Sequence, residues 1–211
     1  MDKPRMIKIH PQNPQRRLLT QAVAVVATGG VIAYPTDSSY ALGCRLSDKS
    51  AADQLRRLRR VDSSHPFTLL CQDLSQLSTY AHVDNPGYRL LRGLTPGAYT
   101  FVLKATREVP HRFVHPKRQT IGIRVPDNLV TLALLEALEQ PLMSTSVISA
   151  DSEESPPARA EEVAERYPGV LGLIVDGGPT PGELTTVVDL SEGVPRLIRA
   201  GRGPLGDWIA G

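Results

Sequence analysis

Cysteine is scarce in this chain, and Cys44 and Cys71 are the only two among 211 residues. Two isolated cysteines exclude a disulfide framework and lack the paired spacing of a zinc site. Long hydrophobic runs are also missing, since the longest apolar stretches fall far short of the roughly 20 residues that cross a membrane. Residues 1–5 do not resemble a secretory signal. We therefore expect a soluble cytoplasmic protein with no membrane partner.

An excess of charge of one sign is absent as well, because 24 basic and 22 acidic residues leave a net charge of only +2. The basic residues are nevertheless clustered, one group within residues 49–60 and another within 104–118. Each cluster alone fits a solvated helix face or loop equally well. Two clusters that flank one pocket would instead form a surface that attracts phosphates. Aromatic residues make up only 5% of the chain, which argues against a stacking platform for single-stranded bases.

Familiar catalytic motifs are missing too. The sequence has no GxxxxGK[ST] phosphate loop, no HExxH zinc motif and no GxSxG nucleophile elbow. If this protein binds a nucleotide, it therefore uses another arrangement of residues.

The hydrophobic pattern alternates between the periods of strands and helices, which predicts one α/β domain over residues 1–211. Short turns near the C-terminal strands indicate antiparallel pairs, so we expect a twisted mixed parallel/antiparallel sheet with flanking helices. Residues 151–160, which are polar and contain prolines, are expected to form a mobile excursion. Strands are expected at 6–9, 31–35, 40–44, 67–71, 99–105, 121–125, 142–146, 173–176, 185–190 and 196–199. Helices are expected from 14 to the Gly29-Gly30 stop, at 49–60 with its arginines mostly outward, and at 74–80, 86–94, 127 or 128 to 138, and 161–167.

The stretch from Gly29 to Cys44 is the most informative part of the chain. A short apolar run ends at Pro35, a hydroxyl-acid-hydroxyl cluster follows at 36–39, and a second apolar run closes on Gly43. A buried strand has no use for four consecutive polar residues. The pattern therefore predicts a loop at a strand end, with polar groups directed at a small ligand.

Further polar side chains stand at the ends of other predicted elements. Taken singly, each fits an ordinary cap, turn or solvated surface better than a ligand site. Arg124 is the exception, because a guanidinium inside an otherwise apolar strand requires an anionic partner. The candidate site residues are Thr36, Ser38, Tyr40, Arg57, Arg59, Thr120, Arg124, Ser144, Thr145, Ser146, Thr185, Thr186 and Arg199.

The loop at 34–44 resembles the PTDTxYGLG signature of the YrdC-like family, the threonylcarbamoyl-adenylate synthases. The resemblance continues in order at residues 96–103, 121–126, 144–146, 185–190 and 199–201, so it spans nearly the whole chain. The Tyr-Pro-Thr-Asp-Ser-x-Tyr-Ala-Leu-Gly-Cys form of the loop and the Phe-Thr-Leu-x-Cys strand are most similar to the YciO branch of this family.

This resemblance implies a YrdC/RibB-like α/β fold with a large, basic, concave cavity. In the synthases the cavity binds ATP, L-threonine and bicarbonate, normally with Mg²⁺. Threonine is carbamoylated and transferred to AMP with release of pyrophosphate, and the product serves the t6A modification of adenosine 37 in tRNA. The family is also described as binding double-stranded RNA and tRNA. We expect no metal-binding residues in the protein itself.

The resemblance also assigns sides of the cavity, although it identifies no catalytic residue. Val61 stands where the synthases have arginine, Ile148 where they have asparagine, and Arg59 where they have lysine. Removing one preorganised donor costs about 10²–10³-fold in rate, so two such losses predict weak or diverged synthase activity. The threonine side would take Thr36, Ser38, Tyr40, Arg124, Thr185 and Thr186, and the nucleotide side Arg57, Arg59, Thr120, Ser144, Ser146 and Arg199.

Three hypotheses remain open from the sequence. The first is a nucleotide- and RNA-binding relative of the synthases with weak or altered activity. The second is a non-enzymatic RNA-binding module that keeps the basic surface. The third is an enzyme that acts on another nucleotide or carbamoyl substrate.

Overall fold

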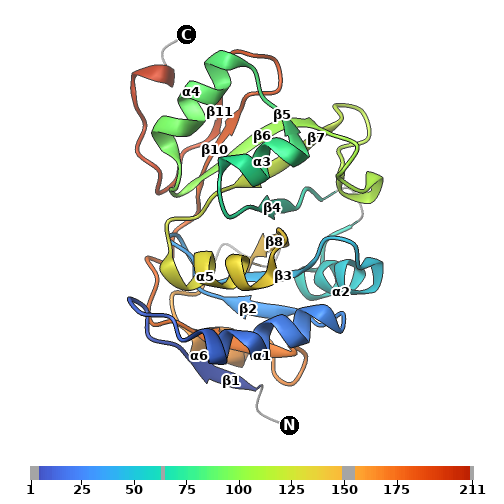
Figure 1. Cartoon of the computed structure of the whole chain (residues 1–211), viewed down its shortest axis with the longest axis vertical. Helices are drawn as coiled ribbons and strands as arrows, with labels where there is room; N and C mark the ends of the chain where they lie inside the picture. The colour runs from blue at the N-terminus through green and yellow to red at the C-terminus, as the bar shows by residue number, and fades with distance from the viewer. Residues whose placement is uncertain (1–4, 63–64, 149–154, 210–211) are drawn as a thin grey trace.

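A computed structural model describes residues 5–62, 65–148 and 155–209 of the chain (Figure 1). Strands and helices alternate along the sequence, as the hydrophobic pattern predicts. The strands are β1 (Met6–Lys8), β2 (Ile32–Tyr34), β3 (Ala41–Arg45), β4 (Thr68–Leu70), β5 (Ala81–His82), β6 (Tyr99–Ala105), β7 (Thr120–Arg124), β8 (Leu142–Ser146), β9 (Leu173–Asp176), β10 (Thr186–Asp189) and β11 (Arg196–Arg199). The helices are α1 (Arg16–Ala27), α2 (Lys49–Arg59), α3 (Leu74–Tyr80), α4 (Asn85–Leu94), α5 (Leu129–Leu138) and α6 (Ala160–Arg166), with 3-10 turns η1 (His111–Phe113) and η2 (Asp207–Ile209).

Within the described residues, eleven strands form one sheet in the order β1-β9-β2-β3-β8-β4-β7-β6-β10-β11, and β5 pairs with β6. The pairs β1–β9, β9–β2, β4–β7 and β6–β10 are parallel. The pairs β2–β3, β3–β8, β8–β4, β7–β6, β10–β11 and β5–β6 are antiparallel. This arrangement confirms the mixed sheet, and Figure 1 shows β1 and β11 toward opposite ends of the molecule.

The two faces of the sheet are covered differently. Leu173 and Val175 of β9 point to the face that packs against α1 and α5, whereas Ile174 points to the opposite core. This alternation is the period of two that a strand imposes on its side chains. Helices α2, α3, α4 and α6 contribute to the core on the second face. Helices α1 and α5 cover the first face beside β2 and β9. The same face lines an open cavity at β8, β4, β7 and β6.

Side-chain caps begin several helices where the sequence carries aspartate or asparagine. The carboxylate of Asp48 accepts a hydrogen bond from the backbone N–H of Ala51 at 2.9 Å, at the start of α2. Of the two expected caps for α5, Asn128 makes the bond, because its side chain accepts from the N–H of Thr131 at 3.1 Å. Such caps satisfy backbone donors that the first helical turn leaves free.

The strands and helices expected from the sequence are confirmed, with small shifts at their ends. The short strand β5 and the turn η1 were not expected. The excursion expected at 151–160 lies in part outside the described residues, and its last residue, Ala160, begins α6. In the described part of the chain, no helix combines the length and the apolarity that crossing a bilayer requires. Cys44 and Cys71 are free and buried.

Candidate functional site: an arginine-lined cavity

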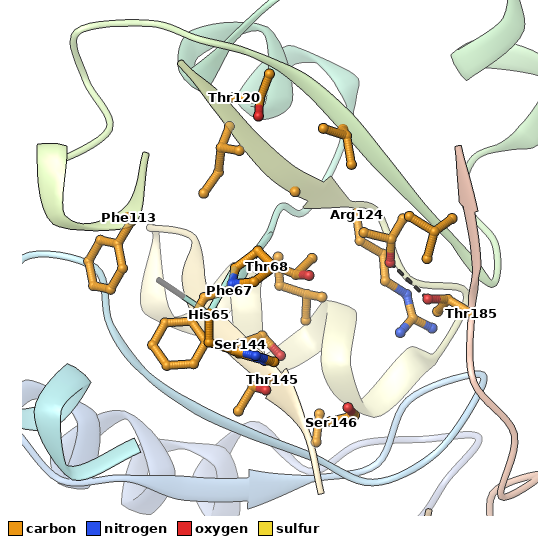
Figure 2. A pocket seen from close by; sticks show the side chains of 18 of the residues that line it. His65, Phe67, Thr68, Phe113, Thr120, Arg124, Ser144, Thr145, Ser146 and Thr185 are labelled. Atoms are coloured by element: carbon orange, nitrogen blue, oxygen red, sulfur yellow. Dashed lines mark hydrogen bonds between the residues drawn. The ribbon is translucent and has the colours of Figure 1, made fainter. Parts of the chain in front are cut away.

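A cavity of about 540 Å³ opens on the first face of the sheet (Figure 2). Its floor is a row of side-by-side residues on β6, β7, β4 and β8, namely Val102, Gly122, Thr68 and Ser144. Basic side chains surround this floor, and the described lining residues include no aspartate or glutamate. The cavity therefore favours an anionic guest. Its basic lining residues are Arg59, Arg112, Arg118, Arg124, Arg199, His65 and His115.

One end of the cavity is built around Arg124, at the end of β7. The side chain of Arg124 is 8% exposed and forms an ion pair with Asp37. It also donates to Oγ of Ser38 at 3.1 Å and lies 3.5 Å from Oγ1 of Thr36. Burial lowers the pKa of Arg124, and the carboxylate of Asp37 opposes this shift only in part. The guanidinium stays charged because arginine is not deprotonated in proteins. Asp37 is the anionic partner that the sequence required.

The polar loop after β2 is folded on itself by Thr36. Its Oγ1 accepts from the backbone N–H groups of Ser38 and Ser39 at 3.1 and 3.2 Å, and donates to the carbonyl of Ser39 at 2.7 Å. Thr36, Ser38 and Ser39 line the cavity, and all three are buried. The loop therefore presents hydroxyl groups in a preset arrangement, as expected for a binding loop.

Thr185 and Arg199 line the cavity near Arg124. Oγ1 of Thr185 lies 2.9 Å from Oγ1 of Thr100, the bond drawn dashed in Figure 2. The guanidinium of Arg199 donates to the carbonyl of Thr185 from Nε at 3.3 Å and from Nη2 at 3.0 Å. Neutral acceptors satisfy part of Arg199, so its positive charge remains available to an anion.

The opposite end of the cavity contains Arg59, the last residue of α2. The expectation that the arginines of this helix point mostly outward is wrong for Arg59, which is only 5% exposed. Its Nε donates to Oγ1 of Thr145 at 3.1 Å, while Nη1 is buried without a hydrogen-bond partner. Burial lowers the pKa of Arg59. The helical spacing could have revealed this position, because Arg59 follows the inward residues Ala52 and Leu55 by seven and four positions.

An aromatic wall that the sequence did not indicate stands at this end. Phe67 and Phe113 line the cavity with ring centres 6.1 Å apart, and Figure 2 shows them across the cavity from Arg124. The guanidinium of Arg112 lies 4.9 Å from the Phe113 ring, and that of Arg56 lies 5.2 Å from the Phe67 ring. These stacked cations fix the rings in place. Nothing in the sequence indicated this pair, because the chain has few aromatic residues and these two are far apart along it. The loop at 111–119 brings Phe113 to Phe67 only in the folded structure.

His65 lines the cavity beside this wall, with its ring 6.0 Å from Phe67 in an edge-to-face arrangement. Burial lowers the pKa of His65, and the nearby charge of Arg59 lowers it further. His65 therefore favours the neutral imidazole, which can both donate and accept a hydrogen bond.

Most of the predicted site residues converge on the cavity, but three do not line it. The hydroxyl of Tyr40 donates to the carbonyl of Gly178 at 2.8 Å. The hydroxyl of Thr186 donates to the carbonyl of Gly203 at 2.6 Å, and Arg57 is exposed on α2. Ile148 lines the cavity and Val61 does not. The predicted residues that line it are Thr36, Ser38, Arg59, Thr120, Arg124, Ser144, Thr145, Ser146, Thr185 and Arg199.

Metal-binding side chains do not gather in the described part of the chain. No group of three or more histidine, cysteine, aspartate or glutamate side chains is close enough there to hold an ion. The hydrogen-bonding and ionic groups of the cavity are instead suited to a ligand that carries its own negative charge.

Comparison with known proteins identifies the family. A family model for Sua5, YciO and YrdC proteins, described as telomere recombination, matches residues 24–201. The chain belongs to the Sua5/YciO/YrdC family. It is 51% identical over 203 residues to the uncharacterized protein YciO of Escherichia coli K12, covering 95% of this chain and 97% of that protein. It is 30% identical over 186 residues to the threonylcarbamoyl-AMP synthase of Pyrococcus abyssi, covering 87% of this chain but 54% of the synthase.

Solved structures of the same family have the same fold. The crystal structure of E. coli YciO superposes with a TM-score of 0.89 at 49% identity, covering 97% of this chain and 98% of that one. The crystal structure of P. abyssi Sua5 complexed with L-threonine superposes with a TM-score of 0.84 at 27% identity, covering 93% of this chain and 57% of that one. This Sua5/YciO/YrdC chain therefore spans little more than half the length of the P. abyssi synthase.

Proposed function

We propose that the cavity binds an adenine nucleotide, ATP or AMP, together with a small amino acid, and that the chain carries a weak or diverged threonylcarbamoyl-AMP synthase activity. The observation that carries this proposal is that Arg124, with Thr36 and Ser38 beside it, shares one cavity with Arg59 and Arg199. An amino-acid carboxylate and a nucleotide phosphate are both anions that bind best to guanidinium and hydroxyl donors. The relative crystallised with L-threonine supports the assignment of an amino-acid end.

The two ends of the cavity would then have separate tasks. Arg124 would hold the amino-acid carboxylate, with the hydroxyls of Thr36 and Ser38 fixing its orientation. Arg59 would bind phosphate oxygens, since its Nη1 is buried without a partner and an anion would satisfy it. Phe67 and Phe113, whose rings are tilted by 49°, offer apolar ring surface against which a purine would pack.

The anionic co-substrates follow from the same electrostatics. Bicarbonate is small enough to enter between the two ends of a cavity of about 540 Å³. Mg²⁺ prefers oxygen ligands, and no carboxylate is among the described residues that line the cavity. The ion would therefore be held by the phosphates of the nucleotide and by water, with no dedicated protein cage.

The chemistry is proposed to be weak because one polar group of the nucleotide end is replaced. Ile148 lines the cavity and presents an alkyl group where a donor would stabilise charge on the phosphates. The exchange removes a hydrogen bond that matters most in the transition state, so turnover would suffer more than binding.

The test compares two arginines of the same helix. Arg59→Gln removes a cation that lines the cavity, whereas Arg57→Gln removes an exposed cation of α2 outside it. Calorimetric titration with ATP and threonine should show roughly tenfold weaker ATP binding for R59Q, since hydrogen bonds to charged groups contribute about 1.5–3 kcal/mol. R57Q should bind as the unmodified protein does.

Activity is measured as pyrophosphate release with ATP, L-threonine and bicarbonate. The proposal expects slow release that requires all three, and R59Q should reduce the rate at least about tenfold when ATP is below saturation. ATP binding without any threonine-stimulated release would contradict the synthase part. Equal ATP affinity of R59Q and R57Q would contradict the location of the nucleotide in this cavity.

Binding of double-stranded RNA or tRNA is a second candidate, because cations also stand exposed outside the cavity. Arg57 on α2 and Arg60 directly after it are exposed, and Lys117 is exposed on the loop beside the cavity. If these groups contact phosphates, the logarithm of the RNA affinity falls linearly with the logarithm of salt concentration, with a slope near −0.9 per contact on a duplex. R57Q should then reduce the slope without changing ATP binding. An affinity that does not change with salt would rule this candidate out.

A third candidate, another nucleotide or carbamoyl substrate, is favoured by Ile148 in the cavity wall. A thermal-shift screen addresses it directly, since a ligand at about 100 times its Kd stabilises the folded state by roughly 2.7 kcal/mol. A carbamoyl compound that stabilises the protein more than threonine does would replace the synthase assignment.

A further inference from the structure

Asp189, the last residue of β10, is a buried carboxylate at the centre of an ion cluster outside the cavity lining. Its side chain is 4% exposed, and its Oδ2 pairs with Arg118 and lies 3.2 Å from Nη2 of Arg196. Its Oδ1 accepts from the backbone N–H of Ser191 at 2.9 Å and from the hydroxyl of Ser191 at 2.7 Å. Four contacts on one carboxylate offset the cost of its burial.

Arg118 connects this cluster to the cavity. It belongs to the loop of residues 114–119, lines the cavity, and has a side chain that is 41% exposed. Its backbone is held from two sides, because the N–H donates to Nδ1 of His115 at 3.1 Å and the carbonyl accepts from Lys104 at 3.3 Å. The side chain of Arg118 thus pairs with the buried carboxylate of Asp189 and also lines the cavity.

We propose that Asp189 is a positioning residue that acts through Arg118, orienting its guanidinium toward an anionic ligand entering the cavity. This inference rests on the proposed function, since it requires that the cavity binds a polyanion. An arginine has five N–H donors in a rigid plane, so a carboxylate that binds one edge fixes the direction of the other edge. Arg118 thereby becomes a preset phosphate donor, with little side-chain entropy left to lose on binding.

Charge alone predicts the opposite effect for the loss of Asp189. Asp189→Asn removes one negative charge close to a basic cavity, which would strengthen anion binding if only the field mattered. If Asp189 positions Arg118, the same substitution weakens binding, because Arg118 then samples many orientations. The direction of the change therefore separates positioning from simple electrostatics.

Glu192→Gln provides the matched control. Glu192 lies three residues beyond Asp189, carries the same charge, has a side chain that is 76% exposed, and pairs with Lys104 at 3.0 Å. E192Q changes the net charge as D189N does, while Asp189 and Arg118 keep their ion pair.

The experiment measures Kd values for ATP and for inorganic tripolyphosphate by calorimetry, using D189N, R118Q, the double variant and E192Q. R118Q and D189N should each weaken binding roughly tenfold, because a charge-assisted hydrogen bond is lost or misaligned. D189N should cause no further loss in the R118Q background. In E192Q the Kd should be unchanged or slightly smaller, because one negative charge is removed. Hydrogen exchange of the amides of residues 114–119 should accelerate more in D189N than in E192Q, because E192Q leaves the pair of Arg118 and Asp189 intact and affects only Lys104, which also donates to the carbonyl of Arg118.

The outcomes separate the two proposals. Unchanged or tighter binding by D189N, or an equal loss in the R118Q background, overturns the role of Asp189 and leaves the proposed function intact. Tripolyphosphate binding without ATP binding overturns the proposed function. The role of Asp189 is then decided by the tripolyphosphate Kd values of the same variants. Failure to bind either anion overturns both. If D189N does not fold, R118Q decides, because Arg118 is exposed and unchanged affinity in that variant overturns the inference.

Discussion

The hydroxyl of Tyr34 on β2 donates a 2.6 Å hydrogen bond to Oγ of Ser144 on β8, across the intervening strand β3. The Tyr34 ring passes directly over Gly43, where a Cβ atom would lie 2.7 Å from the ring. Ser144 lines the cavity, so this contact connects the buried core to the floor of the site. The glycine near the end of the polar loop motif is therefore required by a side chain from a neighbouring strand.

Gly43→Ala should destabilise the protein by about 1–3 kcal/mol, because a methyl group beneath the Tyr34 ring overpacks a dense core. Gly93→Ala is the matched control, since Gly93 lies in α4 and a Cβ there meets nothing within 4 Å. That substitution should be neutral or stabilising by up to about 1 kcal/mol, because alanine favours the helix. Urea unfolding measures both changes. Equal stability of G43A and the unmodified protein would contradict the packing described.

Breaking the ion pair of Arg124 and Asp37 should be costly. Asp37→Asn leaves the guanidinium of Arg124 buried without its counter-charge, which typically costs about 3 kcal/mol or more. Glu136→Gln breaks the pair between Arg16 and Glu136, whose side chains are 80% and 51% exposed, and should cost less than about 1 kcal/mol. Urea unfolding of the two variants tests the difference. Similar losses of unfolding free energy in the two variants would contradict the burial of the Arg124–Asp37 ion pair.

Stability should decrease at alkaline pH because of buried tyrosines. Burial raises the pKa of Tyr34 and of Tyr40 above the ordinary value of 10.0. The folded protein thus holds these phenol protons more tightly than the unfolded chain does. The resulting stabilisation is complete below pH 10 and is lost as the pH rises from there toward the folded pKa.

Unfolding in urea at neutral pH and at about pH 11 measures this loss. Tyr34→Phe should reduce the alkaline decrease, although it also removes the bond to Ser144. Tyr88→Phe is the control for removing a phenol hydroxyl at an exposed position, since Tyr88 is 44% exposed. An identical profile for Y34F and the unmodified protein would be inconsistent with the burial of this phenol.

The two thiols should be unreactive in the native protein. Cys44 and Cys71 have no exposed surface, and burial, with a smaller effect from Asp48, raises the pKa of Cys44 to about 12. Burial likewise raises the pKa of Cys71. Because the thiolate is the reactive form, a disulfide reagent at neutral pH should label neither thiol until denaturant exposes both. Rapid labelling of the native protein would mean that these strands open readily.

The sequence determined the local structure of this protein. The aromatic and β-branched residues within 99–105 and the Gly-Gly stop at 29–30 predicted a strand and a helix end correctly, because these features depend on neighbours along the chain. It also determined that Arg124 needs an anion. A guanidinium within an apolar strand has that requirement in any fold.

Only the tertiary structure decided which candidates meet. Thr186 and Tyr40 come from the same segments as Thr185 and Ser38, yet their hydroxyls bond to the carbonyls of Gly203 and Gly178. For Thr185 and Thr186 the difference follows from the one-residue step, which turns the second side chain to the other face of the sheet. Ser38 and Tyr40 lie two residues apart in the loop before β3, where strand periodicity does not apply. The pairings of Phe67 with Phe113 and of Arg118 with Asp189 join residues 46 and 71 positions apart. Such contacts depend on the order of strands in the sheet, which local periodicity does not encode.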